Sequence, residues 1–350
     1  MKTFSVVRWI AVVCIAFLPA VANAHHSFAA TFDIATMSEL EGEVMSVRWK
    51  NPHVLFTIKT TDAQGDEVLY NIESHSLSIM RRTNISSDAL NVGDKVKIAG
   101  HPARRTANSM FVQHLLLPSG KEIVFDPFSQ PRWAENVGTT AKWLATTDDA
   151  QDESTGVFRV WSTSFEDLSV AFPFPETMNP SLIHEYPLTA KAKATVAAFD
   201  PVTDIPTLNC APKGMPVIME QPYPMEIAED GSDIQIRLEE YDTLRTIHMG
   251  VEDTGVDRPS SRLGYSTGRW DGSTLVVETS AVNYGHFDTV GIPLSDAATI
   301  TERFIPSEDG KSLGFKMTVV DPATFTEPVE LSKRWLALAG ASVQPYDCDQ

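Results

Sequence analysis

The sequence predicts a mainly β protein with two barrels, a small one followed by a larger antiparallel β-barrel or sandwich with helical and Pro-rich insertions. Short alternating and β-branched runs recur between residues 39 and 125 and again between 233 and 336. Gly-containing turns such as Trp270-Asp271-Gly272 separate these runs. A change in charge and a Pro-rich stretch at 126–131 divide the two sets, which indicates two domains.

The first 24 residues have the pattern of an export signal. Lys2 and Arg8 give a positive start, and residues 9–21 form an apolar run that is too short to span a membrane. Ala22-Asn23-Ala24 is a small-x-small cleavage site. We expect cleavage after Ala24, a mature chain that begins at His25, and a location in the periplasm or outside the cell. Because no later apolar run reaches ~18 residues, no membrane span is expected.

The charge argues against nucleic acid as a partner. The chain has 28 Lys and Arg against 46 Asp and Glu, and removal of residues 1–24 takes away two of the basic residues. The resulting net charge of −20 repels nucleic acid and anionic lipid. Residues 25–125 hold 10 basic and 11 acidic side chains, whereas 126–350 hold 16 and 35. We therefore predict a barrel domain over 25–125, a linker over 126–155 and a second barrel domain over 156–350.

Residues 25–125 are expected to form an OB-like barrel. Asn51-Pro52 interrupts the first strand region, and a short helix follows the third strand, both of which are typical of that fold. An aromatic stacking ladder for single-stranded nucleic acid is missing from the pattern. The expected elements are strands over 39–50, 53–61, 67–72, 95–100, 110–117 and 122–125, and a helix over 77–83.

The first barrel is rich in histidine, with six of the nine histidines of the chain between residues 25 and 114. His25 would offer copper its α-amine and its imidazole Nδ1, and one further imidazole would complete a T-shaped nitrogen set that Cu(II) accepts. His53 follows the Asn51-Pro52 kink and His101 lies at a strand end, so either is a candidate for that role. The alternative is that His53 caps a bulge and His25 lies in a frayed tail.

Three motifs carry a resemblance in this region: HHSFAATFD at 25–33, WKNPH at 49–53 and LNVGDKVKIAGHPAR at 90–104. They resemble an uncharacterised family of small secreted bacterial proteins that begin His-His-Ser-Phe after cleavage and carry Trp-x-Asn-Pro-His. The resemblance covers roughly 25–125 and implies no activity. More loosely, His25 alone is similar to the mature N-terminus of exported copper-binding proteins.

Helices and loops are expected in the linker and at the start of the second domain. The linker is expected to hold a helix over 135–146, and the second domain to open with a strand over 156–161. Residues 189–199 predict a helix with Thr189 as its N-cap. The Pro- and Gly-rich residues 209–224 predict a long loop at the barrel mouth. Further strands are expected over 298–304, 312–320 and 329–336.

Cys210 and Cys348 are the two cysteines left after removal of residues 1–24, which contain Cys14. Two cysteines in an exported chain indicate one disulfide, which would tie the C-terminal tail to the middle of the chain. The alternative is two unpaired thiols.

A second resemblance covers residues 156–348. YPLTAKAKA at 186–194, CAPKGMP at 210–216, GYSTGRWDGSTLVVET at 264–279 and DPATFTEP at 321–328 are similar to a second uncharacterised group of exported bacterial proteins. This likeness implies a β-rich fold and no reaction.

The second domain also has a weaker likeness to lipocalin-type calycins, which pair an aromatic residue after an early Gly with an Arg on the last strand. The corresponding residues are Gly156, Phe158 or Trp161, and Arg334. The Gly-x-Trp of calycins is Gly156-Val157-Phe158 in this chain, which departs from their pattern.

Strand parity places some polar residues inside the second barrel. Glu302 shares a strand face with Ile300 and Phe304, and Arg245 shares one with Ile247. A buried Glu302 beside Arg245, Arg269 or Arg334 would be a structural ion pair or part of a ligand site. The candidate ligand-binding residues are Arg245, Arg269, Trp270 and Arg334.

Two functions remain open. One is an exported binding protein that holds an apolar small molecule in the second barrel, with copper as an optional ligand of the first. The other is a cofactor-independent isomerase, lyase or hydrolase, since no nucleophile elbow, phosphate loop, zinc motif or dinucleotide fingerprint is present. A barrel cavity shared by several titratable groups would favour the enzyme. No protein partner is indicated. The candidate catalytic residues are Tyr241, His248, Tyr265, Glu278 and Glu302.

Overall fold

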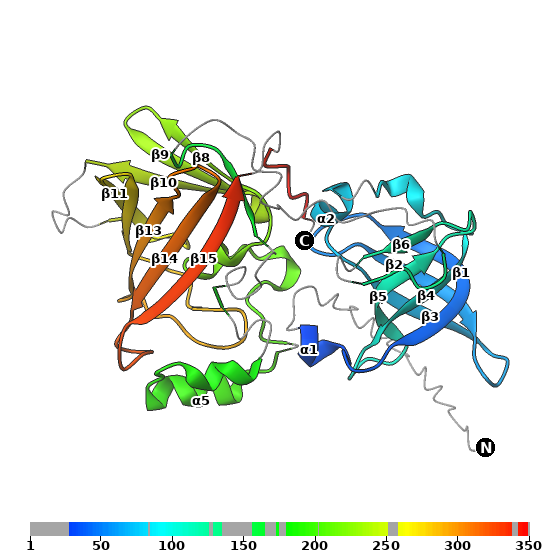
Figure 1. The fold of residues 1–350 in the computed structure, drawn as a ribbon. Coiled ribbons are helices and arrows are strands. Elements are labelled where there is room, and N and C mark those ends of the chain that lie inside the picture. The colour runs from blue at the N-terminus through cyan, green and yellow to red at the C-terminus, as the bar shows by residue number, and fades with distance from the viewer. Residues whose placement is uncertain are drawn as a thin grey trace, which may run out of the picture.

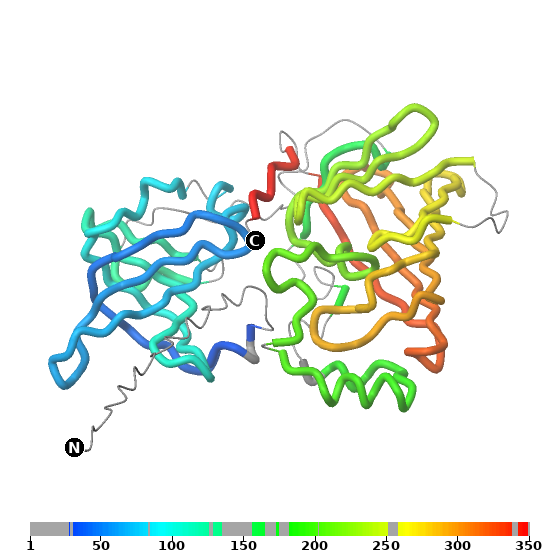
Figure 2. Tube along the Cα trace, turned by 180° about the vertical axis from the view of Figure 1, so that it is seen from behind, coloured from blue at the N-terminus to red at the C-terminus, as the bar shows by residue number. Residues whose placement is uncertain are grey.

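The computed structural model describes residues 28–82, 85–125, 129–134, 156–164, 173–174, 180–201, 203–250, 258–337 and 342–348. These residues form two β-barrels that stand side by side, as Figure 1 shows and Figure 2 shows from behind. The last described residues of the chain run between the two barrels. The expected export signal, His25, His26 and the expected helix over 135–146 lie outside the described residues.

The N-terminal barrel confirms the small OB-like barrel that the sequence predicts. Its ring is closed by a parallel pairing of β3 with β5, while its other strand pairs are antiparallel. The short strand β6 extends the sheet beyond β5, and α2 lies between β3 and β4. The elements are α1 (Phe28–Thr31), β1 (Ser38–Arg48), β2 (Leu55–Thr61), β3 (Glu67–Glu73), α2 (Leu77–Arg82), η1 (Ser87–Ala89), β4 (Lys95–Pro102), β5 (Ser109–Leu116) and β6 (Glu122–Val124).

Alternation along these strands builds the core of the N-terminal barrel. Every second residue of β2 and β4 points inward, so Ile58 and Ile98 are fully buried. α2 adds Leu77 and Met80 to the same hydrophobic cluster. Because this cluster fills the barrel, any site of this domain has to lie at its rim.

The C-terminal barrel has nine strands in the ring order β10-β11-β12-β13-β14-β15-β7-β8-β9. Its strand pairs are antiparallel except for β10 with β11, so the predicted antiparallel barrel is confirmed with one parallel pair. Strands that alternate in direction cannot close a ring of odd number, so one parallel pair is required. The strands are β7 (Val160–Thr163), β8 (Met225–Asp230), β9 (Asp233–Leu238), β10 (Thr243–Met249), β11 (Tyr265–Asp271), β12 (Thr274–Ser280), β13 (Thr299–Pro306), β14 (Ser312–Val320) and β15 (Val329–Ala337).

Helical segments surround and fill this second barrel. The expected helix is confirmed as α5 (Ala190–Ala198), whose N-cap Thr189 Oγ1 accepts a hydrogen bond from the amide of Ala192 at 3.2 Å. Two expectations are wrong. The first strand begins at Val160 rather than Gly156, and residues 209–224 are more than a surface loop. They include the end of η4 (Leu208–Cys210) and the whole of the buried η5 (Val217–Glu220). The other short helices are η3 (Pro180–Glu185) and η6 (Glu240–Asp242).

The expected disulfide is confirmed. Cys210 and Cys348 are bonded, with their Cα atoms 6.1 Å apart. Among the described helices, none combines the length and the apolar character needed to cross a bilayer.

Candidate functional site

Three histidines from separate stretches of the N-terminal barrel surround Phe111 of β5. The ring centroid of Phe111 lies 5.2 Å from that of His75 and 6.3 Å from that of His53, both in edge-on geometry. His101 of β4 is the register partner of Phe111 across the sheet. The topology therefore gathers His53, His75 and His101 at one end of the barrel, which we call the histidine end.

The start of the described chain docks at the histidine end. The ring of Phe28 lies 4.7 Å from Phe111 and 6.0 Å from His101. Phe32 packs behind it with its side chain 2% exposed. The Thr31 carbonyl accepts a 2.7 Å hydrogen bond from the backbone amide of Arg104, which fixes this segment to the barrel. The N-terminal approach to the histidine end is thus an ordered part of the fold.

The hydrogen bond of His101 determines which of its ring nitrogens has the lone pair that could bind a metal. Its Nδ1 lies 2.8 Å from the carbonyl oxygen of Thr36, which can only accept. In the neutral ring Nδ1 therefore carries the proton, and Nε2 holds the lone pair that a metal would use.

His53 also directs Nδ1 toward oxygen acceptors, and one of them is the carboxylate of Glu73. Its Nδ1 lies 3.0 Å from the carbonyl oxygen of Ser74 and 2.7 Å from Oε1 of Glu73. Burial lowers the pKa of His53, but the charge and hydrogen bond of Glu73 outweigh it, so the pKa of His53 is raised. A carboxylate behind the ring is the arrangement that orients metal-binding histidines.

The histidine end needs a further donor to become a metal site. Within the described part of the chain, no group of three or more His, Cys, Asp or Glu side chains is arranged to hold a metal ion. His25 precedes the docked Phe28 by three residues, a reach of at most about 10 Å in an extended chain. His25 is therefore close enough in sequence to supply that donor.

His114 belongs to a hydrogen-bond network around Glu122, at a different place in this barrel. Its Nδ1 lies 2.9 Å from Oε1 of Glu122, which is fully buried. Glu122 also accepts backbone hydrogen bonds from Arg132, Trp133 and Ala134 at 2.7 to 2.9 Å. Burial raises the pKa of Glu122, but these amide donors together outweigh it and hold it below the usual range.

Arg245 and Glu302 form the buried ion pair that strand parity indicates. Glu302 is fully buried, and Arg245 Nη1 donates to its Oε1 at 2.9 Å while Nη2 donates to Oε2. The same guanidinium donates to Ser266 Oγ and to Thr279 Oγ1. A network this well satisfied points to a structural role inside the barrel.

The barrel interior is occupied where an apolar ligand was expected. The side chains of η5 are all buried, and the Nζ of Lys333 donates to the carbonyl oxygens of Glu220 and Gln221 at 2.9 Å each. Burial lowers the pKa of Lys333 to about 7, and the charge of Glu220 opposes that shift. A ligand in the interior would have to displace this plug of protein side chains.

His248 and Tyr265 are brought together at one end of the C-terminal barrel. The His248 ring stacks on Tyr265 with centroids 4.7 Å apart, and its Nδ1 lies 2.8 Å from Oδ2 of Asp233. The hydrogen bond from His248 holds the pKa of Asp233 below its usual value. Arg258 lies 4.4 Å above the Tyr265 ring. Sequence reasoning missed Asp233, although it is the cross-strand neighbour that follows the Ile247–Ile234 pair.

The remaining candidates of this barrel lie in other environments. Glu278 and Arg269 form a loose pair at 3.8 Å with both side chains more than half exposed. Trp270 is 45% exposed and contacts the edge of Phe158. Tyr241 packs against Tyr346, with ring centroids 5.0 Å apart. Because Glu302 is fully buried and Glu278 is exposed, these two catalytic candidates do not share one environment.

Trp161 contacts a different arginine from the one that the calycin likeness implies. Trp161 is fully buried and donates through Nε1 to the carbonyl oxygen of Val157, and Arg159 lies over its ring at 5.2 Å. Arg334 of β15 is the register partner of Gly314 in β14. The arginine that the structure places on Trp161 is therefore the nearby Arg159.

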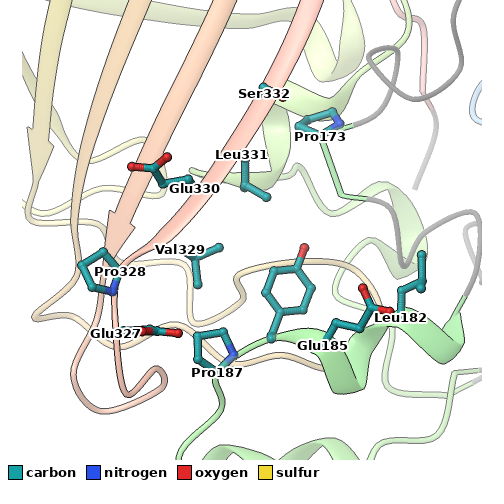
Figure 3. Close-up of a pocket in the computed structure, with 11 residues that line it drawn as sticks. Pro173, Leu182, Glu185, Pro187, Glu327, Pro328, Val329, Glu330, Leu331 and Ser332 are labelled. Carbon is teal, nitrogen blue, oxygen red and sulfur yellow. The ribbon is translucent and has the colours of Figure 1, made fainter.

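Two of the surface pockets formed by the described residues flank this barrel. One of about 370 Å³ is lined by Asp233, Met249, Arg269, Trp270 and Phe158, beside the Asp233–His248 pair. Figure 3 shows the other, of about 400 Å³, at the start of β15. It carries three carboxylates, Glu185, Glu327 and Glu330, among proline and aliphatic side chains. None of the residues predicted to form a site lines this second pocket.

The comparisons with known proteins concern the N-terminal barrel. Residues 11–111 match the model of a family described as "Family of unknown function (DUF6152)". No curated protein matches the chain. The match covers the His-His-Ser-Phe start, the Trp-Lys-Asn-Pro-His stretch and the residues of the histidine end up to Phe111. The N-terminal part of this chain is therefore similar to DUF6152, a family of unknown function.

Proposed function

We propose that this protein is an exported copper-binding protein. Cu(II) would be held at the histidine end by the α-amine and imidazole of His25 and by the imidazole of His53 or His101. The observation that carries the proposal is the docking of Phe28, whose ring lies 4.7 Å from Phe111 and 6.0 Å from His101. That contact fixes the chain three residues after His25 at the barrel end that gathers the other imidazoles.

The donor chemistry suits Cu(II). An α-amine and an imidazole of the same residue form a chelate, and nitrogen sets of this kind favour copper over harder divalent ions. His53 and His101 each direct Nδ1 toward an oxygen acceptor, so in each neutral ring the lone pair that would ligate copper is on Nε2. Either ring would complete a three-nitrogen set.

The fold reduces the entropic cost of closing such a site. Phe32 is 2% exposed, and burying a phenylalanine side chain contributes about 2 kcal/mol. Since Phe32 and the Thr31–Arg104 hydrogen bond already order the segment, copper has only a few residues before Phe28 left to fix.

The test is a Cu(II) titration of the chain that begins at His25 against the same chain with its α-amine acetylated. Acetylation removes the chelating amine of His25 and leaves every side chain unchanged. We expect the affinity to fall roughly 100-fold, because one of three nitrogen donors is lost. The exposed His184 supplies a matched control, His184→Ala, that should keep the original affinity. Equal affinity with and without the acetyl group, or no binding in either protein, overturns the proposal.

The Asp233–His248 pair favours a second candidate function, an isomerase, lyase or hydrolase that acts on an apolar small molecule. Asp233 accepts from Nδ1 of His248, so Nε2 would serve as a general base at the rim of the 370 Å³ pocket. Native mass spectrometry with a library of apolar small molecules tests it. A ligand retained by the protein and by His184→Ala but lost in Trp270→Ala, which alters the pocket lining, supports this candidate. Retention by all three proteins contradicts it.

A further inference from the structure

The last described residues, 342–348, form a segment between the two barrels that we call the C-terminal strap (Figures 1 and 2). On the side of the N-terminal barrel, Asn51 donates through Nδ2 to the carbonyl oxygen of Tyr346, and its own amide donates to the carbonyl oxygen of Asp347 at 3.3 Å. Asn51 is fully buried. Lys50 Nζ lies 3.0 Å from Oδ1 of Asp347. The strap is therefore part of the N-terminal barrel's surface.

The same strap is bound to the C-terminal barrel. The amide of Tyr346 donates to Oδ1 of Asp242 at 3.0 Å, and the amide of Gln344 donates to Oε2 of Glu239 at 3.0 Å. The Tyr346 side chain is fully buried and packs against Tyr241 and Tyr223. Each barrel thus binds part of the strap, and the strap lies in the contact region between the two barrels, which we call the joint.

The two barrels also meet directly beside the strap. Arg82 of α2 donates from Nη1 to Oε1 of Glu239 at 2.8 Å, and Glu239 is fully buried. The carboxylate that receives Gln344 of the strap is therefore the one that binds Arg82 of the other barrel. Displacing the strap would leave this carboxylate with one donor fewer at the joint.

One covalent bond closes the joint. Cys348 at the end of the strap is bonded to Cys210, which is 8% exposed, whereas Cys348 is only half-buried. Asn209, Cys210 and Asp347 next to the bond have φ values of 56°, 58° and 55°. L-amino acids seldom adopt this left-handed conformation, so the folded joint holds both segments in backbone states that they do not favour.

We propose that the Cys210–Cys348 disulfide is a redox modification site and that the C-terminal strap is a redox-controlled clamp between the barrels. The compound that would react with this disulfide is a dithiol, which acts as the reductant. Reduction of the Cys210–Cys348 disulfide would free the strap and loosen the joint, while each barrel keeps its own hydrophobic core. This inference does not depend on copper.

In this thiol–disulfide exchange the dithiol supplies the electrons and protons that the two cysteines gain. One of its thiolates attacks Sγ of Cys348, the more exposed of the two residues, the disulfide breaks, and Cys210 leaves as a thiolate. The second thiol of the reductant then attacks the mixed disulfide and releases Cys348. Two electrons and two protons pass to the cysteines, and the reductant becomes a disulfide.

Hydrogen exchange of the full protein, with and without a small dithiol, tests the clamp. The reporters are the amides of Asn51, Gln344 and Tyr346, each of which donates across the joint. We expect their exchange to accelerate at least ~10-fold on reduction, while amides of β13 and β14 stay protected. Mass spectrometry of alkylated protein establishes that the bond is open.

Two variants complete the design. Cys348→Ser without reductant should reproduce the fast exchange of the reporters, and the reduced wild-type protein carries the test if that variant does not fold. Tyr346→Ala with the bond intact should accelerate them less than reduction does. Unchanged protection of the reporters in protein whose bond is open overturns the proposal. Equal acceleration in β13 and β14 also overturns it, because the bond would then stabilise the whole fold rather than the joint.

Discussion

Arg82 and Glu239 form a two-pronged ion pair that joins the N-terminal barrel to the C-terminal barrel. Arg82 Nη1 donates to Oε1 of Glu239 at 2.8 Å, Nη2 donates to Oε2, and the Glu239 side chain is completely buried. A buried carboxylate depends on its cation, because an unpaired charge in the interior is costly. This pair is therefore expected to control how firmly the barrels are held together.

The first prediction is that Arg82→Ala lowers the free energy of unfolding by ~3 kcal/mol, because it leaves the buried Glu239 carboxylate without its cation. Urea unfolding measures the change. Arg81→Ala is the matched control, since Arg81 is the next residue and its pair with Asp347 is partly exposed at 3.6 Å. The control should cost under about 1 kcal/mol. Similar losses in both variants would contradict the role of the pair.

The second prediction concerns the network inside the C-terminal barrel. Glu302→Gln should destabilise the fold by about 3–5 kcal/mol, because Arg245 keeps a charge that no carboxylate compensates. The double variant Arg245→Met with Glu302→Leu should lose less, since it removes both charges. Glu278→Gln is the control, because Glu278 is exposed and pairs with Arg269 only at 3.8 Å. Denaturant titrations that show additive losses in the double variant would refute this account.

The third prediction is a pH dependence that arises from Lys333. Burial lowers its pKa from 10.5 to about 7, so between these values the unfolded chain binds more protons than the folded protein. Stability from this group therefore rises with pH above about 7, by roughly 2 kcal/mol up to pH 9 at most. The carbonyl oxygens that accept from its Nζ favour the ammonium form and reduce the effect.

The measurement is urea unfolding at pH 7 and pH 9 of the wild-type protein and of Lys333→Met. The difference in unfolding free energy between the two proteins should shift in favour of the wild type as the pH rises. A difference that is independent of pH, or one that shifts toward the variant, would show that Lys333 keeps an ordinary pKa.

The fourth prediction tests the docking of Phe28 at the histidine end. Phe28→Ala should weaken Cu(II) binding about tenfold, because the segment that carries His25 loses its contact with Phe111 and becomes costlier to order. Ile34→Ala is the control, since Ile34 lies in the same part of the chain and its side chain is 51% exposed. Calorimetric titration of copper into both variants should give a loss only for Phe28→Ala. A similar affinity in both would remove Phe28 from the account.

Much of the fold could be predicted because it depends on local patterns. Alternation in β13 placed Glu302 inside the barrel, the Thr189 cap marked the start of α5, and the two cysteines that follow the expected export signal indicated their bond. The parallel pairing of β10 with β11 was missed, because strand direction follows from ring closure and leaves no local signal.

The site residues were harder to predict, because tertiary contacts bring them together. His75 joins His53 through their common neighbour Phe111, to which no sequence spacing points. The burial of η5 was hidden by the Pro and Gly residues around it, which are typical of loops. The consecutive apolar residues Val217, Ile218 and Met219 were the signal that could have revealed it, since three such side chains seldom stay in solvent together.

The central claim is that copper binds at the histidine end, and electron paramagnetic resonance of the copper-loaded chain that begins at His25 tests it most directly. The account predicts hyperfine coupling to three nitrogen donors, with one imidazole lost in either His53→Ala or His101→Ala and none lost in His184→Ala. A spectrum dominated by oxygen donors, or one that is unchanged in both His53→Ala and His101→Ala, would contradict it.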